Sequence, residues 1–294
     1  MALKKLSLYL VKNVILNGKM IEGRDSDTAA AFATSWNNLP GGSVYNNEQF
    51  EDWIAPIGES QVKDKSVLEL GCGNGSLMVH MSRWEPSKLI GVELGESVDS
   101  CRENMFNTGF QNYEIIRGDL VEYSSEGYDI VYSIGVLHHL KLPRSGFDSV
   151  VANTKSGGLF HCWVYAKEGN GIVIAAVEPI RRLASKFPWW ITKYLIATPL
   201  AVPFYLYGKT IKSIPFFKRF RSSLPLYDYM QWIGMREFGF FRHVAFDQLV
   251  TPQTTFLSKG EVEQWLSSHS DISQNSVYCI FRNGNSWKFG GRKT

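Results

Sequence analysis

Residues 67–75 read Val-Leu-Glu-Leu-Gly-Cys-Gly-Asn-Gly, a short apolar run followed by three glycines at alternate positions. The run predicts a buried strand, and the residues from Ser76 to Trp84 predict the helix that follows it. Glycine at such a turn permits a positive φ and lets a ligand lie against the backbone. The first N–H groups of the helix are free to donate at the same place. This stretch therefore predicts a strand–loop–helix unit that binds a ligand.

Strand and helix signals continue to alternate downstream of this unit. Strands are expected at residues 89–93, 113–117, 128–134 and 158–165, with helices at 97–108 and 146–154. Strands separated by helices favour a parallel sheet covered on both faces. Near the C-terminus, Ser258 and Glu261 form a capping box that opens another helix. Two more strands, at 276–282 and 287–291, flank an Asn-Gly-Asn turn and predict an antiparallel hairpin.

The sequence before residue 65 contains weaker signals. In residues 1–16, two lysines precede an apolar run that Lys12 interrupts, and no cleavage site for a signal peptide follows, so an amphipathic helix is expected. Residues 25–28, Asp-Ser-Asp-Thr, offer N-cap side chains for a helix over 29–36, and 48–57 predicts a further short helix. Residues 1–64 are therefore expected to form a helical flap.

The composition is that of an ordinary globular chain of 294 residues, of which 44% are hydrophobic. This is enough for one large core, or for a core with an inserted subdomain. We expect the sheet core to comprise residues 65–165 and 258–294, with residues 166–257 inserted as a mainly helical cap. The four cysteines match no metal-binding spacing and lie in apolar or glycine-rich contexts. They predict free thiols in a reducing compartment, and hence a cytoplasmic protein.

The acidic residue and the glycine spacing of residues 67–75 separate two classes of ligand. A dinucleotide-binding loop would have the pattern GxGxxG, but here the third glycine comes one residue early, and NAD binding is disfavoured. The stretch resembles instead the first motif of the class I S-adenosylmethionine-dependent methyltransferases, an acid followed by GxGxG. The resemblance covers about residues 65–165 and resumes weakly in the C-terminal helix and hairpin. It implies a Rossmann-like α/β fold and S-adenosylmethionine as cofactor (S-adenosylhomocysteine as product), bound at Glu69, Gly71, Cys72, Gly73 and Gly75.

Three further motifs of this family follow in order. Gly91-Val92-Glu93 ends the second strand with an acid, and one carboxylate can accept hydrogen bonds from both ribose hydroxyls. Gly118-Asp119-Leu120 follows the third strand, where the family places an acid near the adenine amino group. Residues 128–139 resemble the fourth-strand motif, which lines the methionine part of the cofactor and faces the acceptor. The resemblance implies further cofactor contacts at Glu93, Leu94, Asp119, Leu120 and Ser133.

Two histidines, His138 and His139, come after the fourth strand, at the carboxyl edge where open α/β sheets bind ligands. Histidine can deprotonate an acceptor hydroxyl or amine. Methyl transfer from an activated sulfonium needs little acid–base help, however, because alignment of acceptor and methyl supplies much of the rate. The two histidines are therefore the candidate catalytic residues, with shaping of the pocket as the alternative.

Two aromatic residues, Trp36 and Tyr45, precede the glycine loop by the distance at which related enzymes lay a helical flap over the cofactor. Either ring is a candidate to stack on the cofactor or to bind its carboxylate. For Trp36, a place in the core is the alternative. No metal-binding constellation is visible in the sequence, and the class needs none, so no metal is expected.

One segment carries the whole basic excess. Residues 167–223 hold ten basic and two acidic residues, a net charge of +8, whereas the rest of the chain is net −5. The apolar stretch 187–207 is interrupted by Lys193, Pro199 and Pro203 and is a poor transmembrane span. Three roles stay open for the segment: a cap over a small-molecule pocket, peripheral membrane contact through residues 187–222, and an RNA-facing patch. Further along, His243 and Asp247 are candidates to bind an acceptor or to close the cap.

The leading hypothesis is a methyltransferase that acts on oxygen, nitrogen or sulfur of a small metabolite, lipophilic acceptors included. One alternative is a tRNA or rRNA methyltransferase that uses the basic segment, although nucleic acid is the less favoured partner. Another is a non-catalytic partner protein with the methyltransferase fold. The intact glycine loop and the acids Glu69 and Glu93 argue against the last of these.

Overall fold

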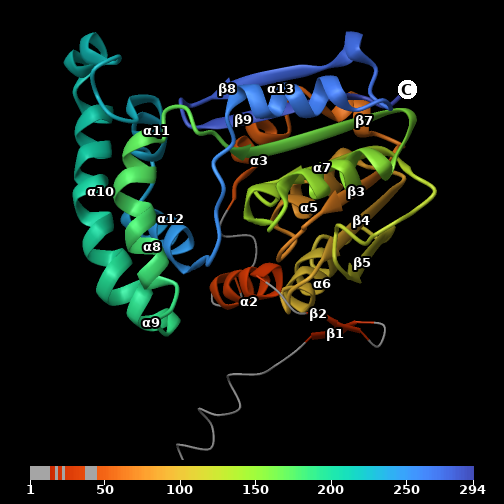
Figure 1. The fold of residues 1–294 in the computed structure, drawn as a ribbon, viewed down its shortest axis with the longest axis horizontal. Helices are drawn as coiled ribbons and strands as arrows, with labels where there is room; N and C mark the ends of the chain where they lie inside the picture. The colour runs from red at the N-terminus through yellow and green to blue at the C-terminus, as the bar shows by residue number, and fades with distance from the viewer. Residues whose placement is uncertain (1–13, 17–18, 22–23, 37–44) are drawn as a thin grey trace, which may run out of the picture.

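The computed structural model describes residues 14–16, 19–21, 24–36 and 45–294. Their centre is a seven-stranded sheet with the strand order β5-β4-β3-β6-β7-β9-β8 (Figure 1). Strands β3 to β7 are parallel, whereas β9 is antiparallel to both β7 and β8. This mixed sheet with its C-terminal hairpin confirms the predicted fold class. The strands of the sheet are β3 (Ser66–Leu70), β4 (Lys88–Glu93), β5 (Tyr113–Arg117), β6 (Tyr128–Ile134), β7 (Thr154–Tyr165), β8 (Tyr278–Arg282) and β9 (Ser286–Arg292).

Helices cover both faces of the sheet because side chains in each strand alternate between the two faces. Leu68 and Val131 face one side, where they join a core with residues of α7 and α13. Val67 and Ile130 face the other side, where they join a core with residues of α3, α5 and α6. The helices around the sheet are α3 (Asn47–Ile54), α4 (Glu59–Val62), α5 (Ser76–Met81), η1 (Ser82–Trp84), α6 (Val98–Phe106), η2 (Leu137–His139), α7 (Pro143–Ala152), α13 (Lys259–Ser268) and η6 (Gln274–Ser276).

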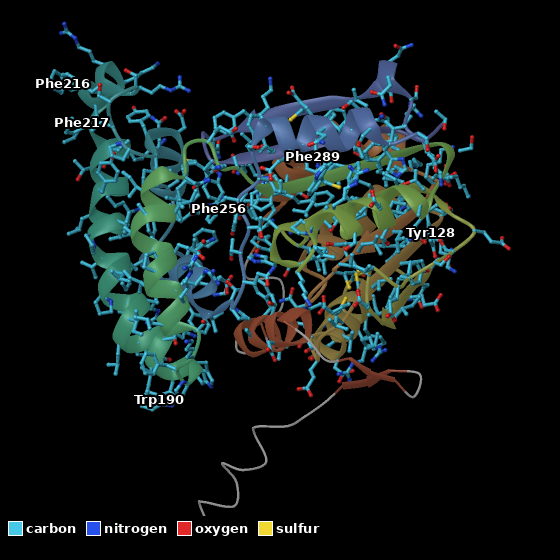
Figure 2. All side chains as sticks on the ribbon, in the orientation of Figure 1. Tyr128, Trp190, Phe216, Phe217, Phe256 and Phe289 are labelled. Carbon is cyan, nitrogen blue, oxygen red and sulfur yellow. The ribbon has the colours of Figure 1, made fainter. Side chains whose placement is uncertain are left out.

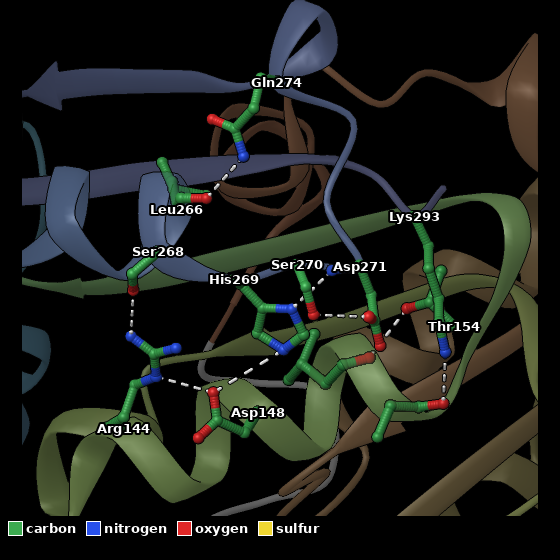
Figure 3. A network of polar contacts seen from close by, with 12 residues as sticks. Arg144, Asp148, Thr154, Leu266, Ser268, His269, Ser270, Asp271, Gln274 and Lys293 are labelled. Atoms are coloured by element: carbon green, nitrogen blue, oxygen red, sulfur yellow. Dashed lines mark hydrogen bonds and ion pairs between the residues drawn. The ribbon is translucent and has the colours of Figure 1, made fainter.

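A polar network fastens the C-terminal helix α13 to the core (Figure 3). Arg144 of α7 donates to the Asp148 carboxylate at 2.7 Å and to the Ser268 hydroxyl at 3.2 Å. The Nε2 atom of His269 lies 3.9 Å from the same carboxylate. The predicted capping box of Ser258 begins α13 at its other end. Residues that follow the inserted segment are thereby tied to the helix between β6 and β7.

Residues 166–257 form a helical unit that stands beside the sheet (Figure 1). Its two ends lie side by side, since Ala166 and Leu257 form a parallel bridge. Trp190 and Phe216 lie at opposite ends of the unit (Figure 2). No helix among the described residues is both long and apolar enough to cross a bilayer. The elements of the unit are η3 (Val173–Val177), α8 (Glu178–Ala184), α9 (Trp189–Ile191), η4 (Thr192–Ala197), α10 (Thr198–Ser213), η5 (Pro215–Phe220), α11 (Tyr227–Ile233) and α12 (Phe238–Val250), of which η3 and η4 are π-helical.

Several predicted boundaries are wrong near irregular backbone. The helix α2 (Arg24–Trp36) begins before residues 25–28, which therefore lie in its first turn rather than at its N-cap, a place that also suits acids. Strand β7 begins at Thr154 rather than at residue 158, because a register shift against β6 carries the pairing past the two glycines 157–158. The expected N-terminal amphipathic helix lies outside the described residues, apart from β1 (Val14–Leu16), which pairs with β2 (Lys19–Ile21).

Candidate active site

A cavity of about 420 Å³ lies at the carboxyl ends of β3 to β7, between the sheet, α2 and the helical insertion. This is the edge at which open α/β sheets bind ligands. The volume is in the range of small-molecule sites. The predicted site residues that line the cavity are Tyr45, Glu69, Gly71, Cys72, Gly73, Glu93, Leu94, Asp119, Leu120 and His139. Three others, Gly75, Ser133 and His138, lie behind this lining.

The glycine loop between β3 and α5 has the conformation that its glycines permit. Gly71, Gly73 and Gly75 have φ values of +82°, +53° and +78°. A Cβ atom on Gly71 would lie 2.6 Å from a methyl of Val136, and one on Gly75 would lie 2.6 Å from Cys101 Sγ. A Cβ atom on Gly73 would have no neighbour within 4 Å. The outer two glycines therefore allow close packing, and the middle one borders open space in which a ligand can lie against the backbone.

Glu93 ends β4 with its carboxylate beside the glycine loop. One oxygen accepts a hydrogen bond from the Gly73 N–H at 2.9 Å, and the other accepts one from the Gly95 N–H at 2.7 Å. Burial raises the pKa of Glu93, and these backbone donors oppose the rise. The Leu94 N–H and the Ser97 side chain also hydrogen-bond to this carboxylate. The carboxylate lines the cavity, and a carboxylate there is the acceptor that a pair of neighbouring hydroxyls, as on a ribose, requires.

Glu69 lies at the end of β3 and is almost fully buried, although it reaches the cavity. The Tyr132 hydroxyl donates to its carboxylate at 2.8 Å. Burial raises the pKa of Glu69 to about 8, despite the opposing effect of that hydrogen bond. The carboxyl group is therefore mostly protonated at pH 7, and a cation in the cavity would favour its ionised form.

Of the remaining predicted cofactor residues, some line the cavity and others are buried behind it. Asp119 lines the cavity after β5, and its Oδ1 accepts from the Val121 N–H at 2.8 Å. Ser133 is fully buried and donates to the Leu70 carbonyl at 2.8 Å, which ties β6 to β3. Cys72 is a buried free thiol, with its Sγ atom 3.9 Å from that of Cys101.

Of the two aromatic candidates upstream, Tyr45 faces the cavity. Its ring lies edge-on to Trp53, with a centroid distance of 4.6 Å. Burial, and next the nearby charge of Asp247, raise the pKa of Tyr45. Trp36 is the last residue of α2, and its side chain lies outside the described part of the structure.

The short helix η2 places the two histidine side chains in different environments. His139 lines the cavity, and its Nδ1 atom lies 2.9 Å from the Gln253 carbonyl oxygen. A carbonyl only accepts, so Nδ1 carries the proton and Nε2 keeps its lone pair. Burial lowers the pKa of His139 to about 4, which leaves the ring neutral at pH 7. His138 is fully buried between His139 and Tyr165, with no hydrogen bond to either ring nitrogen among the described residues.

The far half of the cavity is apolar and comes mostly from the insertion. Its lining there includes Val173, Val177 and Ile180 of η3 and α8, Leu200, Ala201 and Phe204 of α10, Met230, Trp232 and Ile233 of α11, and Phe240, Phe241, Val244 and Ala245 of α12. No lysine or arginine of residues 166–257, all of which are described, is among the lining residues. This half can accept a bulky apolar molecule but offers it few charges.

A few polar side chains border the apolar half, and the sequence analysis missed most of them. Gln248 donates to the Tyr165 hydroxyl at 2.6 Å, and both line the cavity. The Arg282 guanidinium lies over the Trp232 ring at 5.2 Å. Asp247, a candidate from the sequence, also lines the cavity. No spacing in the sequence identifies these residues, since they come from separate elements.

The helix α12 decides the geometry of the pair His243 and Asp247. It places them one turn apart, with 3.1 Å between His243 Nε2 and an Asp247 oxygen. Only Asp247 reaches the cavity. No group of three or more His, Cys, Asp or Glu side chains among the described residues could hold a metal ion.

Similarity to known proteins agrees with this geometry. A tRNA U34 carboxymethyltransferase of Desulfotalea psychrophila is 27% identical over 100 residues, which are 33% of this chain and 31% of that protein. A pavine N-methyltransferase of Thalictrum flavum is 31% identical over 90 residues, 28% of this chain and 24% of the relative. The chain thus matches less than a third of the length of either relative. The solved structure of magnesium protoporphyrin IX methyltransferase from Synechocystis PCC 6803 has a TM-score of 0.54 at 11% identity, over 92% of this chain and 98% of that one, and so shares the fold.

Residues 44–195, just over half of the chain, match the family of methyltransferase domains. The chain belongs to this family, within the class I S-adenosylmethionine-dependent methyltransferases. The predicted family and the predicted cofactor are thereby confirmed. The residues present fit the cofactor: open space borders Gly73, the Glu93 carboxylate lines the cavity, and buried Glu69 can face a cation.

Proposed function

We propose that this chain transfers a methyl group from S-adenosylmethionine to an oxygen, nitrogen or sulfur atom of a small lipophilic acceptor. One observation carries the proposal: the same cavity contains the glycine loop and Glu93 at one end and the apolar side chains of the insertion at the other. The cofactor would supply a methyl group on an activated sulfonium. Binding both molecules in one cavity aligns methyl and acceptor, and such alignment can lower the barrier by several kcal/mol.

The chain's own residues have distinct roles in this proposal. Gly71, Gly73 and Glu93 would hold the cofactor, with Asp119 at its adenine end. The insertion would exclude water from the acceptor and select it by shape. His139 would accept a proton from the acceptor at Nε2, because Nδ1 is held as a donor by the Gln253 carbonyl. His138 would position the His139 ring, with which it is in contact at a centroid distance of 4.1 Å.

An RNA acceptor is the second hypothesis, because one matched relative acts on tRNA and the insertion is basic. The basic side chains of the insertion do not line the cavity, however. A non-catalytic role is the third hypothesis, and the intact glycine loop with Glu69 and Glu93 argues against it. We further propose a cytoplasmic protein with peripheral membrane contact through residues 187–222.

Calorimetric titration of the purified protein with S-adenosylmethionine and, separately, with NAD(H) tests the cofactor end. We expect saturable binding of S-adenosylmethionine only, lost in Glu93→Ala and kept in Glu96→Ala, a matched control because Glu96 is exposed three residues later. Radiolabelled methyl transfer to lipophilic phenols, amines and thiols, with bulk tRNA in parallel, then tests the acceptor. The proposed acceptor class would be overturned if the protein bound the cofactor and methylated tRNA but methylated no small molecule.

A further inference from the structure

The outer surface of the insertion, residues 183–220, exposes large apolar side chains. On η4 and α10, Leu195, Val202 and Leu206 are 64%, 43% and 58% exposed, and their spacing places them on one face of the helix. Trp190 and Phe216, at the two ends of the unit, are also at least half exposed (Figure 2). The other exposed large side chains of this surface are Leu183, Phe187, Tyr194, Ile214 and Phe220.

The opposite face of α10 borders the cavity. Leu200, Ala201 and Phe204 line it, and Ala201 and Ile211 are buried. One helix therefore separates the apolar half of the cavity from the exposed apolar stripe. A helix that is apolar on both faces is expected where its second face also meets an apolar environment.

Positive charge accompanies the apolar side chains. Residues 179–227 contain nine Lys and Arg and no Asp or Glu. Three of the arginines are paired: Arg181 and Arg182 with Glu178, and Arg221 with Asp228. Six cations of the surface make no ion pair with any carboxylate of the described residues: Lys186, Lys193, Lys209, Lys212, Lys218 and Arg219.

We propose that this outer surface docks on the anionic headgroup surface of a lipid bilayer. Exposed Trp, Phe and Leu side chains enter the boundary between headgroups and acyl chains, and Lys and Arg side chains contact anionic lipids. Each basic residue near such a surface strengthens binding about fivefold. Docking in this orientation places a membrane-dissolved acceptor one helix away from the cavity, a consequence that rests on the proposed function.

Two other occupants fit the surface less well. RNA would pair with the cations and stack on aromatic rings, but it would leave the aliphatic stripe of Leu195, Val202 and Leu206 without a partner. A second copy of this chain would bring two surfaces of the same sign together, which opposes association. An anionic bilayer satisfies both the charge and the apolar stripe.

The test is co-sedimentation of the full chain with phosphatidylcholine vesicles, with and without phosphatidylglycerol, at low and physiological salt. We expect binding to the anionic vesicles that weakens as salt rises. The triple variant Lys212→Glu, Lys218→Glu, Arg219→Glu should bind about 100-fold more weakly. Its matched control reverses Lys65, Arg83 and Lys88, three exposed cations near the amino ends of β3 and β4, and should bind like the wild type.

A second pair of variants tests the apolar contribution. Trp190→Ser with Phe216→Ser should weaken vesicle binding. Phe106→Ser with Leu142→Ser, two surface residues beside the sheet that are more exposed still, should not. Absence of binding to anionic vesicles by folded protein, or equal binding by all variants, would overturn the proposal. The proposal would also be overturned if the protein bound RNA or itself instead of vesicles, and if the triple variant abolished that binding. Cofactor titration is independent of these readouts, so a chain that binds vesicles but not S-adenosylmethionine would refute the proposed methyl transfer alone.

Discussion

Binding of the cofactor should release a proton from Glu69. Burial raises the pKa of this carboxyl group to about 8, so it carries about 0.9 proton at pH 7 before the ligand arrives. The cofactor brings a sulfonium and an ammonium group into the cavity, and a nearby cation favours the carboxylate. We therefore expect release of about 0.9 proton per cofactor at pH 7, about 0.5 at pH 8 and about 0.1 at pH 9 from this group.

Calorimetry in buffers of different ionisation enthalpy measures the number of protons released per cofactor bound. That number is the slope of the observed binding enthalpy plotted against the ionisation enthalpy of the buffer. The slope of Glu69→Gln serves as the reference, because proton exchange by the ligand and by other residues is common to both proteins. If the glutamine variant binds too weakly, Tyr132→Phe replaces it. Loss of the Tyr132 hydroxyl removes an interaction that lowers the pKa of Glu69, so proton release should then persist to higher pH.

The ligand-free protein offers an independent measurement of the same group. Folded Glu69 keeps a proton that the unfolded chain loses near its ordinary pKa, so the folded state binds more protons between about pH 4.5 and pH 8. Across this window the free energy of unfolding should fall, by up to about 5 kcal/mol from this residue. Glu69→Gln should lack that part of the fall. Equal proton release and equal pH dependence in wild type and Glu69→Gln would refute the assignment.

Three further outcomes are expected at the loop, the base and the cap. Gly71→Ala should lower the free energy of unfolding by about 2–3 kcal/mol, through positive φ and a clash, and Gly73→Ala by only about 1 kcal/mol; equal losses in thermal unfolding would contradict this. His139→Gln should lower kcat about 100-fold with cofactor affinity unchanged. Because the pKa of His139 is about 4, the ring stays neutral, and able to accept a proton, down to about that pH. A fall in kcat as the pH is lowered past 6.5 would therefore exclude His139 as the base. Ala201→Trp should fill the apolar half and weaken acceptor binding about tenfold, while calorimetry shows unchanged cofactor affinity.

The sheet and the glycine loop beside the cavity were predictable because local chemistry dictates them. Alternating apolar strands, glycines at a turn that needs positive φ, and an acid at the end of β4 are each visible within a few residues of sequence. The errors lie where long-range pairing overrides the local pattern. Thr154 pairs with Tyr128 of β6, but the ladder then shifts register and resumes at Leu159 opposite Ile130, and no signal within the segment encodes that shift.

The helices of the insertion escaped detailed prediction for a related reason. Helix α10 buries Ala201 and Ile211 on one face and exposes Val202 and Leu206 on the other, so its sequence lacks a clear polar stripe. The helix α12 likewise contains four phenylalanines and a valine in its first nine residues, FGFFRHVAF, without a regular polar face. A window of sequence therefore shows an apolar region but not where its helices begin and end.

By itself the sequence determined the parallel sheet, the family and the glycine loop, because these depend on short-range backbone geometry and alternating burial. Only the tertiary structure decided which of two adjacent histidines faces the cavity. The turn of η2 directs His139 to the cavity and buries His138, and the Gln253 carbonyl, over a hundred residues away, fixes which nitrogen of His139 holds the proton. The tertiary structure also decided where the insertion lies, because a bridge between Ala166 and Leu257 holds its two ends together beside the carboxyl edge of the sheet. Such contacts join distant segments, and no local pattern specifies them.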